Sequence, residues 1–239
     1  KTLLLVLLLV LTGCESAPET GAERPVLVLF IGNSFVFYND LPGTVERLAA
    51  AGGARAIETE SVAPGGMTLE THWRSGAALE AIRRGGWDYV VLQEQSTLGP
   101  SPEVNRLPTI ADARTLHAYA PLFDAEVKKA GARTVFYMTW ARRESPQNQA
   151  PLAEAYTAIG RELGATVAPV GLAWKNALEE KPGLVLHDAD GSHPAPAGTY
   201  LAACVFYAVL CDRSPEGLPD FGQPDAALLQ RAAWRTVRP

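Results

Sequence analysis

The sequence of 239 residues lacks three features, and each shortage argues against a class of function. It has no basic run: 21 Lys and Arg are scattered among 26 Asp and Glu, which argues against a nucleic-acid-binding surface. It contains neither Gly-x-Gly-x-x-Gly nor a P-loop lysine, which argues against a nucleotide site. Its four histidines have no partners at metal-ligand spacing, since His187, Asp188 and Asp190 share one loop without distant ligands. We therefore expect no metal and no cofactor.

The amino-terminal end is apolar over residues 3–11, which is too short to span a bilayer but matches the apolar region of a signal peptide. The tetrapeptide that follows, Leu11-Thr12-Gly13-Cys14, resembles a bacterial lipobox. This resemblance implies a lipoprotein signal peptide over residues 1–13, lipidation of Cys14 and an exported protein anchored to the membrane through that lipid. Residues 14–24 are rich in small and polar residues and are expected to form a flexible tether. The residue after Cys14 is not Asp, which by resemblance to bacterial sorting rules favours an outer membrane if the cell has one.

The other two cysteines, Cys204 and Cys211, are seven residues apart in a predicted helix. Two helical turns separate them by roughly 10 Å, which is beyond disulfide reach. We expect two buried free thiols; a disulfide would require the helix to end before Cys211.

Short apolar segments alternate with amphipathic ones along the rest of the chain, and the apolar fraction of 47% is ample for one core. Strands are expected at 26–31, 56–62, 89–92, 134–139 and 166–170. Helices are expected at about 39–52, 68–84, 110–130, 148–163, 172–179, 196–210 and 226–234. This alternation is typical of right-handed βαβ units. It predicts a single α/β domain over 25–239: a doubly wound, flavodoxin-like parallel sheet of about five strands, covered by helices on both faces.

The first strand ends at Gly32-Asn33-Ser34, and this position makes Ser34 a candidate nucleophile. Ligands bind at the carboxyl ends of the strands of an open parallel sheet. The same three residue types are also what a turn with a helix N-cap selects, and the triplet alone leaves both interpretations open.

A late loop supplies the partners that a nucleophilic serine requires, because Asp190 and His193 lie three residues apart before a predicted helix. Histidine suits the base because its pKa lies near neutrality, and a carboxylate holds the imidazole tautomer. We assign Ser34 as the nucleophile, His193 as the base and Asp190 as its partner.

With these residues in place, the globular part of the chain resembles the SGNH/GDSL hydrolase family. The resemblance rests on Gly32-Asn33-Ser34-Phe35 after the first strand, on Gly66 in a second block, and on Asp190-Gly191-Ser192-His193 as the last block. It implies an oxyanion hole made by the N–H groups of Ser34 and Gly66 and by an amide of the third block.

Two departures from the family pattern stand out. Asn33 replaces the usual Asp beside the nucleophile, and the third block, normally Gly-x-Asn-Asp, reads Gln93-Glu94-Gln95. We place Gln95 at the position of the oxyanion-binding Asn, with Gln93 as the fallback. We expect the Glu94 carboxylate to point away from the oxyanion or to bond locally, because a negative charge there would oppose catalysis.

The resemblance favours a serine esterase that hydrolyses small acyl esters, acetyl groups on carbohydrate among them, through an acyl-enzyme. A non-catalytic ligand-binding lipoprotein on the same fold is the first alternative, and a thioesterase or transacylase is the second. The expected partners are a small-molecule or glycan ester and, through Cys14, a membrane. Nothing in the sequence indicates the oligomeric state.

Four further side chains have expected roles of less consequence. His72 and His117 are expected to be partly exposed or satisfied structural residues within helices. Arg143 is expected to pair with Glu144 or to lie exposed. Trp140 is expected either in the core or as a platform on which a sugar stacks.

Overall fold

The computed structural model describes residues 23–99, 103–104, 107–108, 110 and 113–239. The predicted signal sequence over 1–13, the lipidation site Cys14 and most of the tether lie outside these residues. Among the described helices, none has the length and apolar character needed to cross a membrane.

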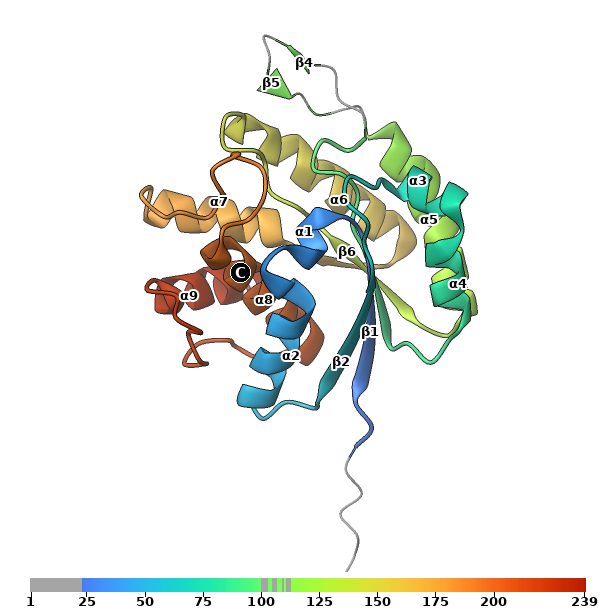
Figure 1. Ribbon diagram of the computed structural model, residues 1–239, viewed down its shortest axis with the longest axis horizontal. Helices are drawn as coiled ribbons and strands as arrows, with labels where there is room; N and C mark the ends of the chain where they lie inside the picture. The colour runs from blue at the N-terminus through green and yellow to red at the C-terminus, as the bar shows by residue number, and fades with distance from the viewer. Residues whose placement is uncertain (1–22, 100–102, 105–106, 109, 111–112) are drawn as a thin grey trace, which may run out of the picture.

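A five-stranded parallel sheet forms the centre of the molecule (Figure 1). Its strands are β1 (Val26–Ile31), β2 (Ile57–Val62), β3 (Tyr89–Leu92), β6 (Arg133–Tyr137) and β7 (Thr166–Ala168). They lie in the order β2-β1-β3-β6-β7, and every pairing is parallel. The chain thus places β2 on one side of β1 and the three later strands of this sheet on the other, as in flavodoxin-like sheets. The predicted doubly wound fold is confirmed.

Helices cover both faces of this sheet. The described helices are α1 (Ser34–Phe37), the 3₁₀ turn η1 (Tyr38–Asp40), α2 (Leu41–Ala51), α3 (Leu69–Ser75), α4 (Ala77–Arg83), α5 (Arg114–Lys129), the 3₁₀ turn η2 (Pro146–Asn148), α6 (Gln149–Leu163), α7 (Val170–Glu180), α8 (Pro196–Cys211) and α9 (Ala226–Val237). Two cores result. One packs α3 to α6 on one face of the sheet, and the other packs α1, α2, α7, α8 and α9 on the opposite face.

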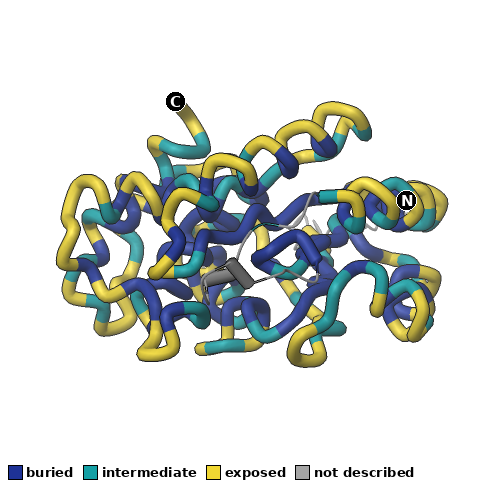
Figure 2. Tube along the Cα trace, turned by 90° about the horizontal axis from the view of Figure 1, so that it is seen from above, coloured by how far each residue is buried: buried dark blue, intermediate teal, exposed yellow. Residues whose placement is uncertain are grey.

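Strand β1 contributes to both cores by alternation along its length. Leu29 and Ile31 belong to the core of α3 to α6, whereas Val28 and Phe30 belong to the other. All four are fully buried, which explains why the strand is a continuous apolar run. In Figure 2 the buried segments lie inside and the exposed ones follow the outer turns of the helices.

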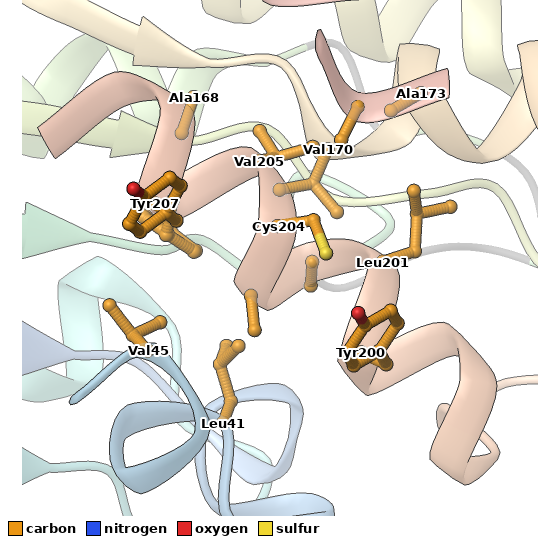
Figure 3. Close-up of a cluster of buried hydrophobic side chains, with 14 of the residues drawn as sticks. Leu41, Val45, Ala168, Val170, Ala173, Tyr200, Leu201, Cys204, Val205 and Tyr207 are labelled. Atoms are coloured by element: carbon orange, nitrogen blue, oxygen red, sulfur yellow. The ribbon is translucent and has the colours of Figure 1, made fainter. Parts of the chain in front are cut away.

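Helix α8 is buried along most of its length (Figure 3). Its side chains lie between Leu41 and Val45 of α2 and Val170 at the start of α7. The helix spans both cysteines, and both are free: Cys204 is buried and Cys211 is half-buried. Burial raises the pKa of the Cys204 thiol to about 12, which makes this thiol unreactive.

Three details of the expected secondary structure are wrong. The single helix expected over 68–84 is two helices, α3 and α4, separated at Gly76, whose φ of +82° favours glycine. The helix expected from about residue 110 begins at Arg114, after a short hairpin of β4 (Glu103–Val104) and β5 (Leu107–Pro108). The third is the start of the first helix, expected at about residue 39: the short helix α1 begins at Ser34 with Asn33 as its N-cap, as one of the two interpretations of the Gly32-Asn33-Ser34 triplet allows.

Candidate active site

Ser34 lies at the end of β1, where the strand turns into α1. Asn33 caps this helix: its Oδ1 accepts the Phe35 N–H at 3.2 Å, and its Nδ2 donates to the Met67 carbonyl at 3.0 Å. A carboxylate at this position could accept the first bond but could not donate the second. The replacement of Asp by Asn therefore ties the turn at Ser34 to the loop between β2 and α3.

Ser34, His193 and Asp190 are brought together from positions far apart in the sequence. His193 Nδ1 lies 2.5 Å from Asp190 Oδ2, and His193 Nε2 lies 2.9 Å from Ser34 Oγ. A carboxylate can only accept, so we assign the ring proton to Nδ1, which leaves Nε2 to accept from the Ser34 hydroxyl. This is the geometry in which an imidazole can take a proton from a serine.

The Asp190 carboxylate is held by the backbone of its own loop. Its Oδ1 accepts the N–H groups of Ser192 and His193, each at 2.9 Å. Partial burial raises the pKa of Asp190, but the hydrogen bonds from the His193 ring and these two N–H groups outweigh it and lower the pKa to about 2. Asp190 is therefore ionised over the whole neutral range.

The loop that carries Asp190 and His193 is anchored through its carbonyl groups. Trp140 Nε1 donates to the Ser192 carbonyl at 3.0 Å, and Asn39 Nδ2 donates to the Pro194 carbonyl at 2.9 Å. Two further carbonyls, those of Asp188 and Ala189, accept from the Arg143 guanidinium at 3.2 and 3.1 Å. The position of His193 is thus fixed from several elements at once, as preorganised catalysis requires.

Aromatic rings hold the plane of the His193 imidazole. Tyr38 stacks on it with ring centroids 4.2 Å apart, and Phe35 meets it edge-on at 5.8 Å. Phe35 in turn stacks on Trp140 at 4.5 Å, and Trp140 on Trp174 at 3.9 Å. Trp140 is 1% exposed, so it is a core residue and cannot stack on a sugar. The sequence pattern did not indicate these roles of Phe35 and Tyr38, although their places one and four residues after Ser34 put them beside the nucleophile.

The residues predicted to bind the oxyanion differ in backbone conformation and in the hydrogen bonds that their side chains make. Gly66 has a φ of +73°, which favours glycine, and it precedes Met67, the residue bonded to Asn33. Gln95 Oε1 accepts the N–H and hydroxyl of Ser96 at 2.6 and 3.1 Å. Gln93 is fully buried, and both ends of its amide bond to backbone groups. The assignment of Gly66 and Gln95 to an oxyanion hole stays a prediction.

The remaining expectations concern structural side chains. Of the two alternatives expected for His72, partly exposed or satisfied structural residue, the structure favours the second: the ring is fully buried, and its Nε2 lies 2.6 Å from the Gly32 carbonyl oxygen. His117 is exposed on α5. His187 is buried and bonds through Nε2 to the Ala141 carbonyl at 3.0 Å. Arg143 pairs with Glu144 at 3.0 Å, as predicted.

A cavity of about 500 Å³ lies beside α7, near the His193 loop. Trp174, Leu178 and Leu186 form part of its apolar wall, and Arg143 and His187 border it. None of the three residues of the Ser34 cluster lines this cavity. We assign it no part in the chemistry at Ser34.

Glu94 bonds locally, as predicted, and is fully buried. Its Oε2 accepts the Leu69 N–H at 3.1 Å and its Oε1 accepts the Gln95 N–H at 2.6 Å. Burial raises the pKa of this carboxyl to about 7, against the opposing effect of the two N–H groups.

This raised pKa predicts a pH-dependent stability. The folded protein holds the Glu94 proton more tightly than the unfolded chain, so the stabilising contribution is complete below pH 4.5 and is lost as the pH rises to about 7. The loss is roughly 3 kcal/mol in the free energy of unfolding. Urea denaturation between pH 4.5 and 8 should show this decline in the wild type and a flatter profile in Glu94→Gln. Glu80→Gln on the exposed side of α4 is the control and should keep the wild-type slope; equal slopes in all three proteins would contradict the prediction.

Comparisons with known proteins show which structures this chain resembles. No family model matches the sequence, and a search of the curated proteins finds no match. A candidate SGNH hydrolase from Slackia heliotrinireducens is similar in structure, with 28% identity, a TM-score of 0.62, and coverage of 78% of this chain and 100% of the other. A DUF4886 family protein from Bacteroides uniformis matches at 20% identity with a TM-score of 0.70, covering 90% and 95%.

An acetylxylan esterase from Geobacillus stearothermophilus matches at 16% identity, with a TM-score of 0.57 and coverage of 76% and 92%. A lipase/acylhydrolase from Enterococcus faecalis matches at 16% identity, with a TM-score of 0.61 and coverage of 79% and 96%. At these identities the likeness is one of fold. The chain has the fold of the SGNH/GDSL hydrolases, as its sequence predicts.

Proposed function

We propose that the protein is a serine esterase that hydrolyses small acyl esters through an acyl-enzyme. The observation that carries this proposal is the chain of two contacts from Asp190 to His193 to Ser34, at 2.5 and 2.9 Å. Ser34 Oγ attacks the ester carbonyl while His193 Nε2 takes its proton and then delivers it to the leaving alcohol oxygen. Water, deprotonated by the same imidazole, attacks the acyl-serine; the imidazolium then returns this proton to Ser34 Oγ as the carboxylic acid is released.

The oxyanion of each tetrahedral intermediate requires nearby hydrogen-bond donors. We assign this role to the N–H groups of Ser34 and Gly66 and to the amide of Gln95. Ser34 is the first residue of α1, and the first N–H groups of a helix have no acceptor within it. The side-chain Oε1 of Gln95 accepts from the N–H and hydroxyl of Ser96, which fixes the amide group and leaves its NH₂ end as the donor.

The favoured substrates are acetyl esters on carbohydrate. A neighbour with this fold is an acetylxylan esterase, which supports the assignment at the level of analogy. Phe37 is 49% exposed, and its ring centroid lies 5.7 Å from that of Tyr38, the ring stacked on His193. An exposed aromatic ring close to the reacting serine offers a surface for the apolar face of a sugar.

We also propose that the protein is exported and held at a membrane through a lipid on Cys14. The support is the apolar segment over 3–11 and the lipobox-like tetrapeptide that follows it. Labelling of the full-length protein with a clickable fatty acid in a bacterial host, compared with Cys14→Ser, tests this part separately.

A panel of esters tests the enzymatic proposal. Aryl acetates and acetylated xylo-oligosaccharides should be hydrolysed with kcat/KM at least tenfold higher than aryl octanoates, and a fluorophosphonate probe should label Ser34. Preference for acyl thioesters, or acyl transfer to an added alcohol in place of hydrolysis, would favour the thioesterase or transacylase alternative. Absence of both turnover and labelling in folded protein would leave a ligand-binding protein as the function.

A further inference from the structure

We propose that Gln93 and His72 are positioning residues that hold the backbone turn of the nucleophile from its two sides. The inference rests on the proposed function, because it assigns these residues to the reaction at Ser34. It gives the unusual third block a role that differs from donation to the oxyanion.

The peptide group between Gly32 and Asn33 is bonded on both of its polar atoms by buried side chains. The Asn33 N–H donates to Gln93 Oε1 at 2.9 Å. The Gly32 carbonyl oxygen lies 2.6 Å from His72 Nε2. With both atoms bonded, this peptide plane cannot rotate without breaking a buried hydrogen bond, and the next peptide leads directly into Ser34.

The protonation of His72 fits this role. The ring is fully buried, and burial lowers the pKa of His72, so the imidazole is neutral and carries one N–H. The Gly32 carbonyl can only accept, which places that proton on Nε2. Nδ1 is buried and has no hydrogen-bond partner among the described residues. The single N–H of this ring is therefore committed to the turn.

The space around Gly32 is shaped to the Gln93 amide. A Cβ at Gly32 would lie 2.4 Å from Gln93 Oε1 and 2.8 Å from Val36 Cγ2, both far inside contact distance. The absence of a side chain at Gly32 is what lets the Gln93 amide approach the turn. Gln93 Nε2 donates to the Glu94 carbonyl at 2.6 Å, which fixes the amide orientation with its oxygen toward Asn33.

The segments that carry Gln93 and His72 are also hydrogen-bonded to each other. The Glu94 carboxylate follows Gln93 in sequence and accepts the N–H of Leu69, the first residue of α3. Helix α3 also carries His72. The segment after β3 and helix α3 thus form one hydrogen-bonded unit, which contacts the turn after β1 from both sides through Gln93 and His72. The direction of Ser34 Oγ toward His193 depends on this unit.

Removal of either the Gln93 amide or the His72 ring should lower the rate of the chemical step more than it weakens substrate binding. In Gln93→Met and His72→Leu we expect kcat for an aryl acetate to fall about 10- to 100-fold, since small displacements of a reacting group have effects of that order. KM should stay within about threefold. His72→Gln places an N–H donor at a similar reach and should recover most of kcat, which a purely structural loss of the ring would not allow.

Gln230→Met is the matched control for loss of a buried glutamine. Gln230 is 3% exposed and also grips a loop, since its Oε1 accepts the Gly217 N–H and its Nε2 donates to the Leu218 carbonyl. It should lower the melting temperature as Gln93→Met does while leaving kcat within about twofold of the wild type. If Gln93→Met is recovered unfolded, Gln93→Asn, one methylene shorter, serves the same comparison.

An activity-independent measurement separates this inference from the proposed function. In the Ser34→Ala background, amide hydrogen exchange of Asn33 should be slow and should become at least tenfold faster when Gln93→Met is added. This readout remains informative even if no ester is hydrolysed by the wild type, which would overturn the esterase alone. Unchanged Asn33 exchange, or kcat within threefold of the wild type in both Gln93→Met and His72→Leu, would overturn the positioning role.

Discussion

Ser34→Ala is expected to lower kcat for an aryl acetate by about 10⁴-fold or more, to a rate set by the residual binding groups. The hydroxyl is the group that forms the acyl-enzyme, and no neighbouring side chain can replace it at 2.9 Å from His193 Nε2. Binding of substrate should be nearly unchanged, because alanine removes one oxygen and leaves the turn at Asn33 intact. Steady-state kinetics together with fluorophosphonate labelling measure both effects, and labelling should disappear.

Ser192→Ala is the matched control. Ser192 lies next to His193, but its contacts to Asp190 and Trp140 are made by its backbone N–H and carbonyl. Its replacement should keep kcat within about threefold and retain the label. Equal labelling of wild type and Ser34→Ala, or an activity that survives in Ser34→Ala, would place the nucleophile elsewhere and refute the assignment.

Asp190→Asn is expected to lower kcat by roughly 10³- to 10⁴-fold. The carboxylate accepts the Nδ1 proton of His193, and an amide that turned its NH₂ group toward Nδ1 would favour the tautomer in which Nε2 carries the proton and cannot act as the base. The amide oxygen can still accept the N–H groups of Ser192 and His193, so the loop should keep its shape. Kinetics and a thermal melt distinguish the lost tautomer from lost structure.

Asp188→Asn tests whether this effect is specific. Asp188 is exposed on the same loop, and its Oδ1 accepts the Ala189 N–H at 2.7 Å, a bond that an amide oxygen can also accept. The kcat of Asp188→Asn should remain within about threefold of the wild type.

Because the pKa of Asp190 is about 2, protonation of this carboxylate should have no influence on the wild-type rate above pH 4. A loss of less than tenfold in Asp190→Asn would argue against its part in the reaction.

The sheet and the clustering of Ser34, Asp190 and His193 were predictable because their signals are local. The buried run of β1 and the short distance between Asp190 and His193 are both visible in a few consecutive residues. The strand order could be inferred from the alternation of strands and helices, since right-handed crossovers admit few arrangements. The break at Gly76 was missed because a glycine inside an amphipathic pattern is compatible with either a continuous helix or two short ones.

The support of the nucleophile was not predictable, because its contacts cross the sequence. His72 and Gly32 are 40 residues apart, and Gln93 and Asn33 are 60 apart. In the sequence His72 has only the features of a helical residue, and Gln93 resembles an oxyanion donor displaced by two positions. The role of each becomes apparent only where three chain segments meet at one peptide group. Asn33 is similar: its amide matters because Met67 lies within its reach.

The direction of β1 determines which way the site faces. The strand begins at Val26 and ends at Ile31, so it spans about 20 Å between the amino-terminal and carboxyl-terminal ends of the sheet's strands. Arg24, just before the strand, forms an ion pair with Asp88 at the amino-terminal end of the strands, opposite to Ser34. If Cys14 carries a lipid, as we propose, the anchored end of the chain would join the domain at the end of the sheet opposite to Ser34.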